Sequence, residues 1–161
     1  FPTRRSSDLP DRLDAFSSGE FGPVGWVEAG RVRWAGGLTE PISGACLALV
    51  SHTPIGQWPA VEVIMSHAGA HRRLVDALLR SGVDGLVVAC TGNGTVHASL
   101  VEGLREAASQ GVQIRLSTRC ATGQLVGNVA LWPDIQGLSP VKTRISLMLQ
   151  LMADGAAKAS V

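Results

Sequence analysis

The sequence predicts an α/β protein, in which a small parallel sheet has helices on both faces and a β-hairpin precedes it. The unbroken apolar run Leu86–Cys90 is typical of a strand that is covered on both faces. After this run, Val96, Leu100 and Leu104 recur at four-residue steps, as on one face of a helix. From residue 59 onward, such strands alternate with such helices, which predicts parallel pairing through right-handed crossovers.

The expected elements follow one another regularly. We expect strands at 61–66, 83–90 and 112–120, and helices at 70–81, at 95–110 and from Ser139-Pro140 onward. Gly82 and Gly111 stop the first two helices, and Gly155 is expected to end the last one. Earlier in the chain, 26–28 and 31–34 flank Ala29-Gly30 with alternating patterns, which predicts the hairpin.

The composition allows one full hydrophobic core and excludes several classes of partner. Of the 161 residues, 45% are hydrophobic, and 14 lysines and arginines balance 13 carboxylates to a net charge of +1. No basic block is interleaved with aromatic residues, so nucleic acid is not expected as a partner. No apolar stretch approaches the roughly 18 residues of a membrane span, and the N-terminus lacks the apolar centre of a signal peptide. We therefore expect no membrane partner and a cytoplasmic location.

The cysteines Cys46, Cys90 and Cys120 are odd in number and lack CxxC spacing. Two of them end apolar, strand-like runs. We interpret all three as reduced, buried, small hydrophobic residues rather than as disulfide or zinc partners.

A glycine loop after the central strand is the first candidate site. Its two glycines let the backbone turn sharply, and the Thr95 hydroxyl is expected to cap the next helix. Open α/β sheets bind ligands at such a place, beyond the carboxyl ends of their strands. We therefore predict that the substrate-binding residues are Gly92, Asn93, Gly94 and Thr95.

A dinucleotide cofactor is not expected at this loop. His97 stands where the G-x-G-x-x-G pattern requires its third glycine. The following strand, at 113–119, ends without the carboxylate that would bind a ribose.

Other polar residues near the same sheet edge have two open interpretations. Ser117, Thr118 and Arg119 end the third expected strand and would line the site, or Arg119 would pair with a carboxylate at the edge. His67 and His71 have the four-residue spacing of a metal pair, but His67 falls where the first strand ends. We therefore expect two surface histidines and no metal site, and the spacing of the residues reveals no complete catalytic set.

The first nine residues, FPTRRSSDL, match no later pattern in the chain. One choice of codons for them resembles the end of a widely used short-read sequencing adapter. This predicts an adapter-derived artefact at 1–9 and a natural chain that begins near Pro10. The alternative is an ordinary disordered N-terminal tail.

Five motifs occur in a fixed order: VEVIMSHAGA, DGLVV, TGNGTVH, STRCATG and GLSPVKTRISLMLQLM. This series resembles the C-terminal half of bacterial-type L-asparaginases, the asparaginase/glutaminase family. The earlier stretch FGPVGWVEAGRVRW is similar to the hairpin that closes the N-terminal domain of those enzymes. The resemblance spans residues 11–154.

The resemblance implies an amidohydrolase that converts L-asparagine, and often also L-glutamine, to the acid and ammonia without a metal or organic cofactor. In the family a threonine attacks the side-chain amide, and a second threonine, an aspartate and a lysine activate it. These residues lie in the N-terminal domain, in motifs of the TGGT and HGTD type that this sequence lacks, and the position of the lysine falls within 1–9. We therefore expect no catalytic residue in this chain and no activity from it alone.

The resemblance also implies that the loop Gly92–Thr95 completes the active site of a neighbouring subunit in a homo-oligomer, a dimer of dimers. Thr95 stands where well-known members have an asparagine or serine that holds the α-amino and carboxylate ends of the amino-acid amide. The family often places a glutamate after the match to 119–123. Residues 124–136 contain no glutamate, and Asn128 and Asp134 are the polar residues in its place.

The residue patterns and the resemblance together predict an artefact at 1–9, a remnant of the N-terminal domain at 10–34, an interdomain linker at 35–58, a C-terminal α/β domain at 59–154 and a flexible tail at 155–161. Apolar surface is expected to be exposed where the N-terminal domain and a partner subunit pack. The alternative function is a non-catalytic small-molecule-binding or assembly domain of the same fold.

Overall fold

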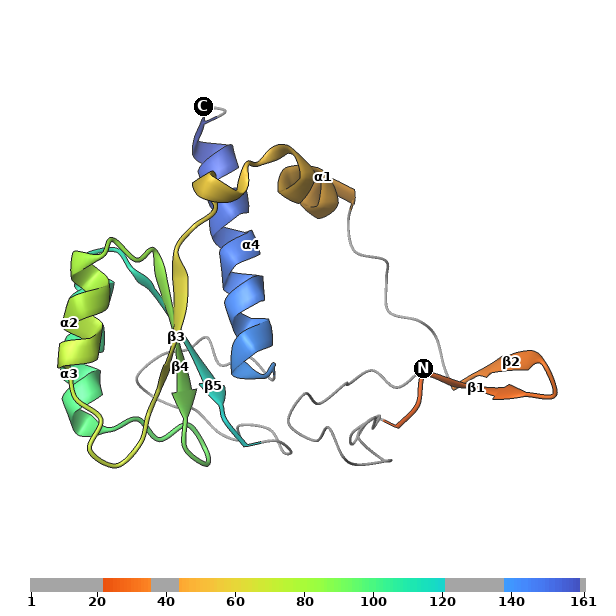
Figure 1. The fold of residues 1–161 in the computed structure, drawn as a ribbon, viewed down its shortest axis with the longest axis horizontal. Coiled ribbons are helices and arrows are strands. Elements are labelled where there is room, and N and C mark those ends of the chain that lie inside the picture. The colour runs from red at the N-terminus through yellow and green to blue at the C-terminus, as the bar shows by residue number, and fades with distance from the viewer. Residues whose placement is uncertain (1–21, 36–43, 121–137, 160–161) are drawn as a thin grey trace. The chain divides into compact units, whose positions relative to one another are not determined.

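The computed structural model describes residues 22–35, 44–120 and 138–159 (Figure 1). The chain divides into two units, Phe1–Ile42 and Ser43–Val161. In the first unit, β1 (Gly25–Glu28) pairs antiparallel with β2 (Arg31–Trp34). The two residues between them, Ala29 and Gly30, have φ of +48° and +76°, which suits a tight hairpin turn. The predicted hairpin is confirmed.

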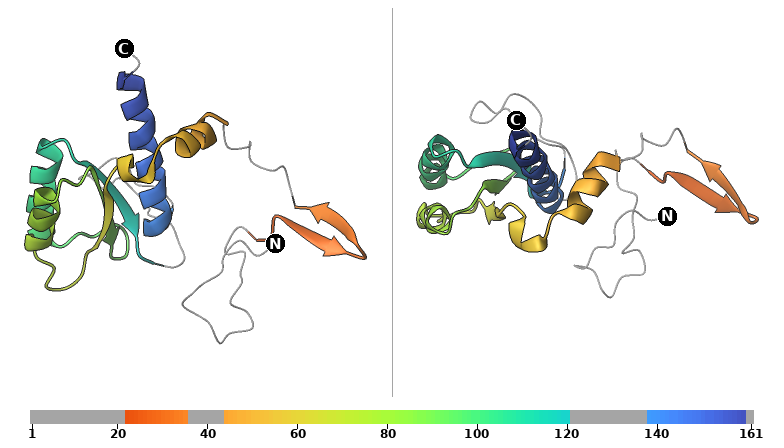
Figure 2. Two further views of the ribbon diagram at one scale, coloured as in Figure 1. Left: turned by 45° about the horizontal axis from the view of Figure 1, so that its top comes forward. Right: turned by 90° about the horizontal axis from the view of Figure 1, so that it is seen from above.

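The second unit contains the predicted parallel sheet. Its elements are α1 (Gly44–His52), a 3-10 turn (Ile55–Gln57), β3 (Val61–Met65), α2 (Arg73–Arg80), β4 (Gly85–Cys90), α3 (Ala98–Ser109), β5 (Gln113–Thr118) and α4 (Pro140–Ala159). The described strands form a parallel sheet in the order β3-β4-β5. Helices α2 and α3 cover one face of the sheet and α4 covers the other (Figure 2). This arrangement confirms the predicted fold class.

Strand β4 is the centre of this unit, and all its residues are buried. Leu86, Val88 and Cys90 belong to the core between the sheet and the helices α2 and α3. Val87 points to the opposite face and packs with Leu147 of α4. The unbroken apolar run is therefore explained by burial on both faces, as the sequence predicted.

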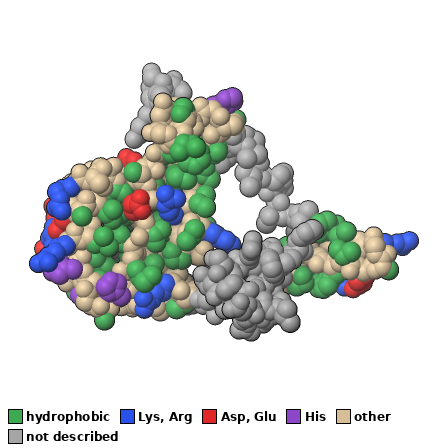
Figure 3. All heavy atoms as spheres, viewed as in Figure 1, with side chains coloured by type: hydrophobic (Ala, Val, Ile, Leu, Met, Phe, Trp, Pro, Cys, Tyr) green, Lys and Arg blue, Asp and Glu red, His purple; other side chains and the backbone are tan. Residues whose placement is uncertain are grey.

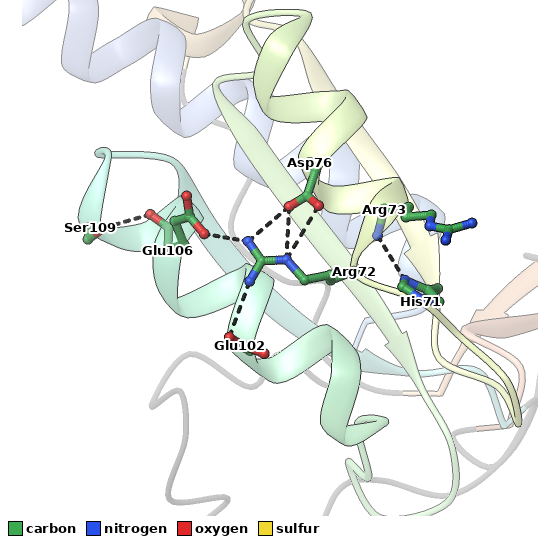
Figure 4. Close-up of polar contacts among 7 residues, drawn as sticks. All are labelled: His71, Arg72, Arg73, Asp76, Glu102, Glu106 and Ser109. Atoms are coloured by element: carbon green, nitrogen blue, oxygen red, sulfur yellow. Dashed lines mark hydrogen bonds and ion pairs between the residues drawn. The ribbon is translucent and has the colours of Figure 1, made fainter.

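Helices α2 and α3 are joined by a group of charged side chains around Arg72 (Figure 4). The Arg72 guanidinium, just before α2, contacts the Asp76 carboxylate on the same helix, with N–O distances of 3.1–3.3 Å. It also forms ion pairs with Glu102 and Glu106 of α3. Hydrogen bonds to Asp76, the largest cause, and to Glu106 hold the pKa of Arg72 above its ordinary value.

Two helices differ from the sequence expectations. Helix α1 forms within the expected linker at 35–58 and contacts α4. Helix α4 continues through Gly155 to Ala159, so the prediction that Gly155 ends it is wrong. Two alanines, the strongest helix formers, directly follow this glycine and offset its low propensity. Helix α4 thus extends into the segment 155–161 that was assigned to a flexible tail.

The face of the second unit seen in Figure 3 carries many charged side chains over one pair of helices and more hydrophobic ones beside it. Charged side chains gather over α2 and α3, at the left of Figure 3, whereas hydrophobic ones reach the surface farther right, toward α4 and α1. Met65 of β3 is 53% exposed and Val141 of α4 is 65% exposed. Exposed apolar surface is thus present. That an N-terminal domain and a partner subunit cover it stays a prediction.

Candidate functional site

Hydroxyl side chains gather where the three parallel strands end. Ser66 directly follows β3, Thr91 follows β4, and Thr118 is the last residue of β5. The strands are in register there, because Cys90 lies opposite Thr118 and the Ser66 N–H donates to the Ala89 carbonyl at 2.9 Å. This edge is the one at which the sequence predicted a site.

The segment Thr91–Thr95 forms a small closed loop at this edge. The Thr91 N–H donates to the Thr95 carbonyl at 3.1 Å, and the Thr95 N–H donates to the Thr91 carbonyl at 2.9 Å. Gly92 and Gly94, between them, have φ of +49° and +84°, a region that favours glycine. The sharp turn predicted from these glycines is therefore present.

Thr95 does not cap helix α3, which corrects the sequence prediction. Its backbone N–H and carbonyl are both used to close the loop, so the helix begins later, at Ala98. The cap is His97, whose Nδ1 accepts a hydrogen bond of 3.2 Å from the Ser99 N–H. The Thr95 side chain is exposed instead.

The four predicted substrate-binding residues lie together, but they are not equally accessible. Gly92, Asn93 and Thr95 are exposed, whereas Gly94 is buried. An amide and a hydroxyl at an exposed loop provide hydrogen-bond donors and acceptors for the charged ends of a small molecule. The arrangement is therefore suited to binding rather than to bond breaking.

The three polar residues expected to line the site from β5 have different surroundings. The Thr118 hydroxyl donates to the Gly92 carbonyl at 2.9 Å, so it contacts the loop directly. Ser117 is fully buried, and its hydroxyl donates to the carbonyl of Leu138, just before α4. Arg119 is exposed, and no carboxylate of the described residues forms an ion pair with it.

Ser66 was missed by the sequence reasoning. It is 2% exposed, and its hydroxyl accepts a hydrogen bond of 2.9 Å from the His97 N–H. The sequence did contain a pattern that could have indicated Ser66 as a site residue, because Ser66 follows an apolar strand just as Thr91 follows the next one. The hydrogen bond itself joins residues 31 positions apart, so no local sequence pattern predicts it.

The described part of the chain shows no activated nucleophile at this edge. The hydroxyls of Ser66, Thr91 and Thr118 bond to backbone groups, and none is hydrogen-bonded to a carboxylate, a lysine or an imidazole ring. Asn128 and Asp134, considered as substitutes for the family glutamate, lie outside the described residues.

The two histidines with metal-like spacing are both exposed, as expected, and they share no helix. His71 lies before α2, which begins at Arg73 rather than near residue 70. His67 Nδ1 lies 2.8 Å from the Ala68 carbonyl, and His71 Nδ1 accepts from the Arg73 N–H at 3.4 Å. Within residues 22–35, 44–120 and 138–159, no group of three or more potential metal ligands is present.

The cysteines only partly follow the prediction. Cys90 is a buried free thiol, and burial raises its pKa to about 11. Cys120 is also free but exposed, so its predicted burial is wrong; β5 ends at Thr118, two residues before it. The side chain of Cys46 lies outside the described part.

Among the described ranges, no helix combines the length and the apolar character needed to cross a bilayer.

Comparison with known proteins gives a consistent result. The family model of the glutaminase/asparaginase C-terminal domain matches residues 60–159. The chain is 28% identical to L-asparaginase 2 of Escherichia coli over 142 residues, which are 84% of this chain and 40% of that protein. It is 30% identical to the glutaminase-asparaginase of Pseudomonas fluorescens over 155 residues, 87% of this chain and 40% of that protein.

Solved structures agree. The structure of a probable cytoplasmic L-asparaginase from Campylobacter jejuni matches with a TM-score of 0.69 and 26% identity, and covers 87% of this chain and 44% of that one. The chain thus spans about 40% of the length of the two curated relatives that it matches. The family match covers the whole sheet and the glycine loop. The chain therefore belongs to the glutaminase/asparaginase family and contains the C-terminal domain of that family.

Proposed function

We propose that this chain is the C-terminal part of an L-asparaginase-type amidohydrolase that hydrolyses L-asparagine, with L-glutamine as a second substrate. The family match over residues 60–159 is the observation that supports this most directly. The relatives' own names, L-asparaginase and glutaminase-asparaginase, support the same substrate class. In the reaction, the amide C–N bond breaks, the acyl carbon takes an oxygen from water, and nitrogen leaves as ammonia.

The catalytic nucleophile, a threonine, is supplied by an N-terminal domain that precedes this chain in the intact protein. The proposal is supported by the absence of TGGT and HGTD motifs from the printed sequence. It is also supported by the hydroxyls at the strand ends, which bond to backbone groups rather than to an activating base. In this proposal, residues 10–34 belong to that N-terminal domain, 35–58 connect the domains, and 59–154 form the C-terminal domain.

The loop Gly92–Thr95 binds the substrate ends that do not react. Thr95 is exposed at the loop, where its hydroxyl is available to the α-amino and carboxylate groups of the amino-acid amide. The loop acts on the active site of a neighbouring subunit in a cytoplasmic dimer of dimers. Exposed apolar side chains on β3 and α4, such as Met65 and Val141, support packing against a further domain or subunit.

Sequencing the gene upstream of Pro10 and expressing the intact protein tests the proposal. We expect TGGT and HGTD motifs in the upstream region and release of ammonia from L-asparagine by the intact protein. The 161-residue chain alone should release none. A DNA-binding or transport module upstream, without these motifs, would instead favour the alternative of a non-catalytic binding or assembly domain.

Two substitutions in the intact protein test the loop. Thr95→Val should raise KM for L-asparagine about tenfold, the worth of one hydrogen bond to a charged group, and Thr95→Ser should keep KM near the wild-type value. Thr143→Val is a matched control, because it removes a buried threonine hydroxyl on α4. An unchanged KM in Thr95→Val would contradict the role of the loop.

A further inference from the structure

The candidate loop is held at both of its ends by hydroxyls from the neighbouring strands. On the β5 side, the Thr118 hydroxyl donates to the Gly92 carbonyl at 2.9 Å. On the β3 side, the Ser66 hydroxyl accepts from the His97 N–H at 2.9 Å. Thr118 ends β5 and Ser66 directly follows β3, the two strands that flank β4, and both residues are distant from the loop in sequence.

The Thr118 hydroxyl both donates and accepts a hydrogen bond in this arrangement. Its oxygen also accepts a hydrogen bond of 3.1 Å from the Cys120 N–H, while its proton goes to the Gly92 carbonyl. One side chain thus joins the end of β5 to the tip of the loop. Thr118 is half-buried, and both hydrogen bonds lie at the exposed end of the strand.

The acceptor of this hydrogen bond decides how the loop is oriented. The Gly92 carbonyl and the Asn93 N–H belong to one planar trans peptide, so fixing the carbonyl fixes the whole plane. Gly92 has a positive φ and nothing within 4 Å of where a Cβ would be. The glycine therefore has no side-chain contact that would prevent rotation of this peptide.

We propose that Thr118 is a positioning residue, which fixes the peptide after Gly92 and so holds Asn93 and Thr95 in place for substrate. Ser66 acts as the second attachment, through the N–H of His97 at the start of α3. The inference rests on the proposed function for its substrate. The positioning itself is a property of this chain and is testable on it.

Amide hydrogen exchange on the 161-residue chain tests the positioning independently of activity. The N–H groups of Thr91 and Thr95 report on loop closure, because each donates to the other residue's carbonyl. Thr118→Val keeps the shape but removes the hydroxyl, and should speed exchange at both groups about fivefold, as expected for one lost hydrogen bond. The Val88 N–H in the centre of β4 serves as the internal reference. Thr118→Ser should restore the slow exchange.

Thr143→Val is the matched control for this experiment. It also removes a buried threonine hydroxyl that bonds to a backbone carbonyl, that of Leu138, but it lies on α4. It should leave exchange at Thr91 and Thr95 unchanged relative to Val88. Equal exchange in Thr118→Val and wild type, or an equal effect of Thr143→Val, would overturn the proposal.

Kinetics of the intact protein provide the second test. Thr118→Val should raise KM for L-asparagine about fivefold with little change in kcat, because the loop binds parts of the substrate that do not react. Ser66→Ala should change KM in the same direction. A fall in kcat at constant KM would overturn the positioning role. If the wild-type protein hydrolyses neither amide, the proposed function fails, whereas the exchange experiment still decides whether Thr118 holds the loop.

Discussion

The Nε of Arg144, on α4, donates a hydrogen bond of 2.7 Å to the backbone carbonyl of Val61 on β3. Strand β3 lies at the edge of the described sheet, and Val61 is fully buried. The hydrogen bond therefore gives a partner to a carbonyl on a buried strand edge. It also connects α4 to a strand 83 residues earlier in the chain.

Replacing this side chain should cost measurable stability. Arg144→Met keeps much of the apolar length but leaves the carbonyl without its donor, and should lower the free energy of unfolding by about 1–2 kcal/mol. Urea unfolding followed by circular dichroism measures this. Lys142→Met, an exposed position on the same helix, is the control. Equal losses in the two variants would show that the hydrogen bond contributes nothing specific.

The ion pairs around Arg72 should stabilise the contact between α2 and α3. Arg72→Met removes the links to Asp76, Glu102 and Glu106, and should lower the free energy of unfolding. Because these side chains are 30–75% exposed to solvent, salt should screen the ion pairs, and the loss should shrink in 1 M salt. Arg73→Met serves as the control, since that side chain points away from the group (Figure 4). A loss that is independent of salt would contradict an electrostatic origin.

Two helical glycines should respond oppositely to substitution. A Cβ at Gly103 of α3 would lie 3.3 Å from the Val75 Cβ of α2, so this glycine lets the helices approach closely. Gly103→Val should destabilise the fold by about 1–3 kcal/mol through overpacking. A Cβ at Gly155 of α4 would meet nothing within 4 Å, so Gly155→Ala should stabilise the fold by about 0.5–1 kcal/mol. Thermal unfolding of both variants measures the two signs, and destabilisation by Gly155→Ala would contradict the helix there.

The buried thiol of Cys90 should make stability fall at high pH. Its pKa is raised from 9.0 to about 11 by burial, so the folded state keeps the proton that the unfolded state loses first. The stabilisation is therefore complete below pH 9 and is lost as the pH rises toward 11. Cys90→Ala should flatten this decline in the free energy of unfolding, whereas Cys120→Ala should not. A decline that persists in Cys90→Ala would refute its assignment to this thiol.

The same two cysteines should differ in reactivity. In the folded chain at pH 8, iodoacetamide should label Cys120, which is exposed, and spare Cys90, which is buried and protonated. Peptide mapping by mass spectrometry separates the two positions. In denaturant both should react. Rapid labelling of Cys90 in the folded state would contradict its burial.

Local patterns predicted most of the fold. The apolar run of β4, the helical spacing after it and the glycine between the hairpin arms each depend on near neighbours in sequence, and each element forms as expected. The predicted end of α4 was wrong, and the reason is local. Gly155 is a helix breaker by propensity, but the alanines that follow it restore the helix.

The site was predicted less completely than the fold. The residues Gly92–Thr95 are contiguous, so their position after a buried strand was visible in the sequence. The role of Thr95 as a helix cap was wrong, because the partner that uses its backbone is Thr91, and His97 competes for the cap position. A propensity for capping does not show which of several nearby residues obtains that position.

The amino-acid pattern was enough to predict the succession of strands and helices, the parallel sheet and the glycine loop at the end of its central strand. These features follow from hydrophobic periodicity and from the conformational freedom of glycine, both of which are local. The tertiary structure alone decided that Thr118 and Ser66 hold this loop and that Arg144 reaches Val61. Such hydrogen bonds join residues 26 to 83 positions apart, and they exist because packing of the sheet and helices brings these donors and acceptors together.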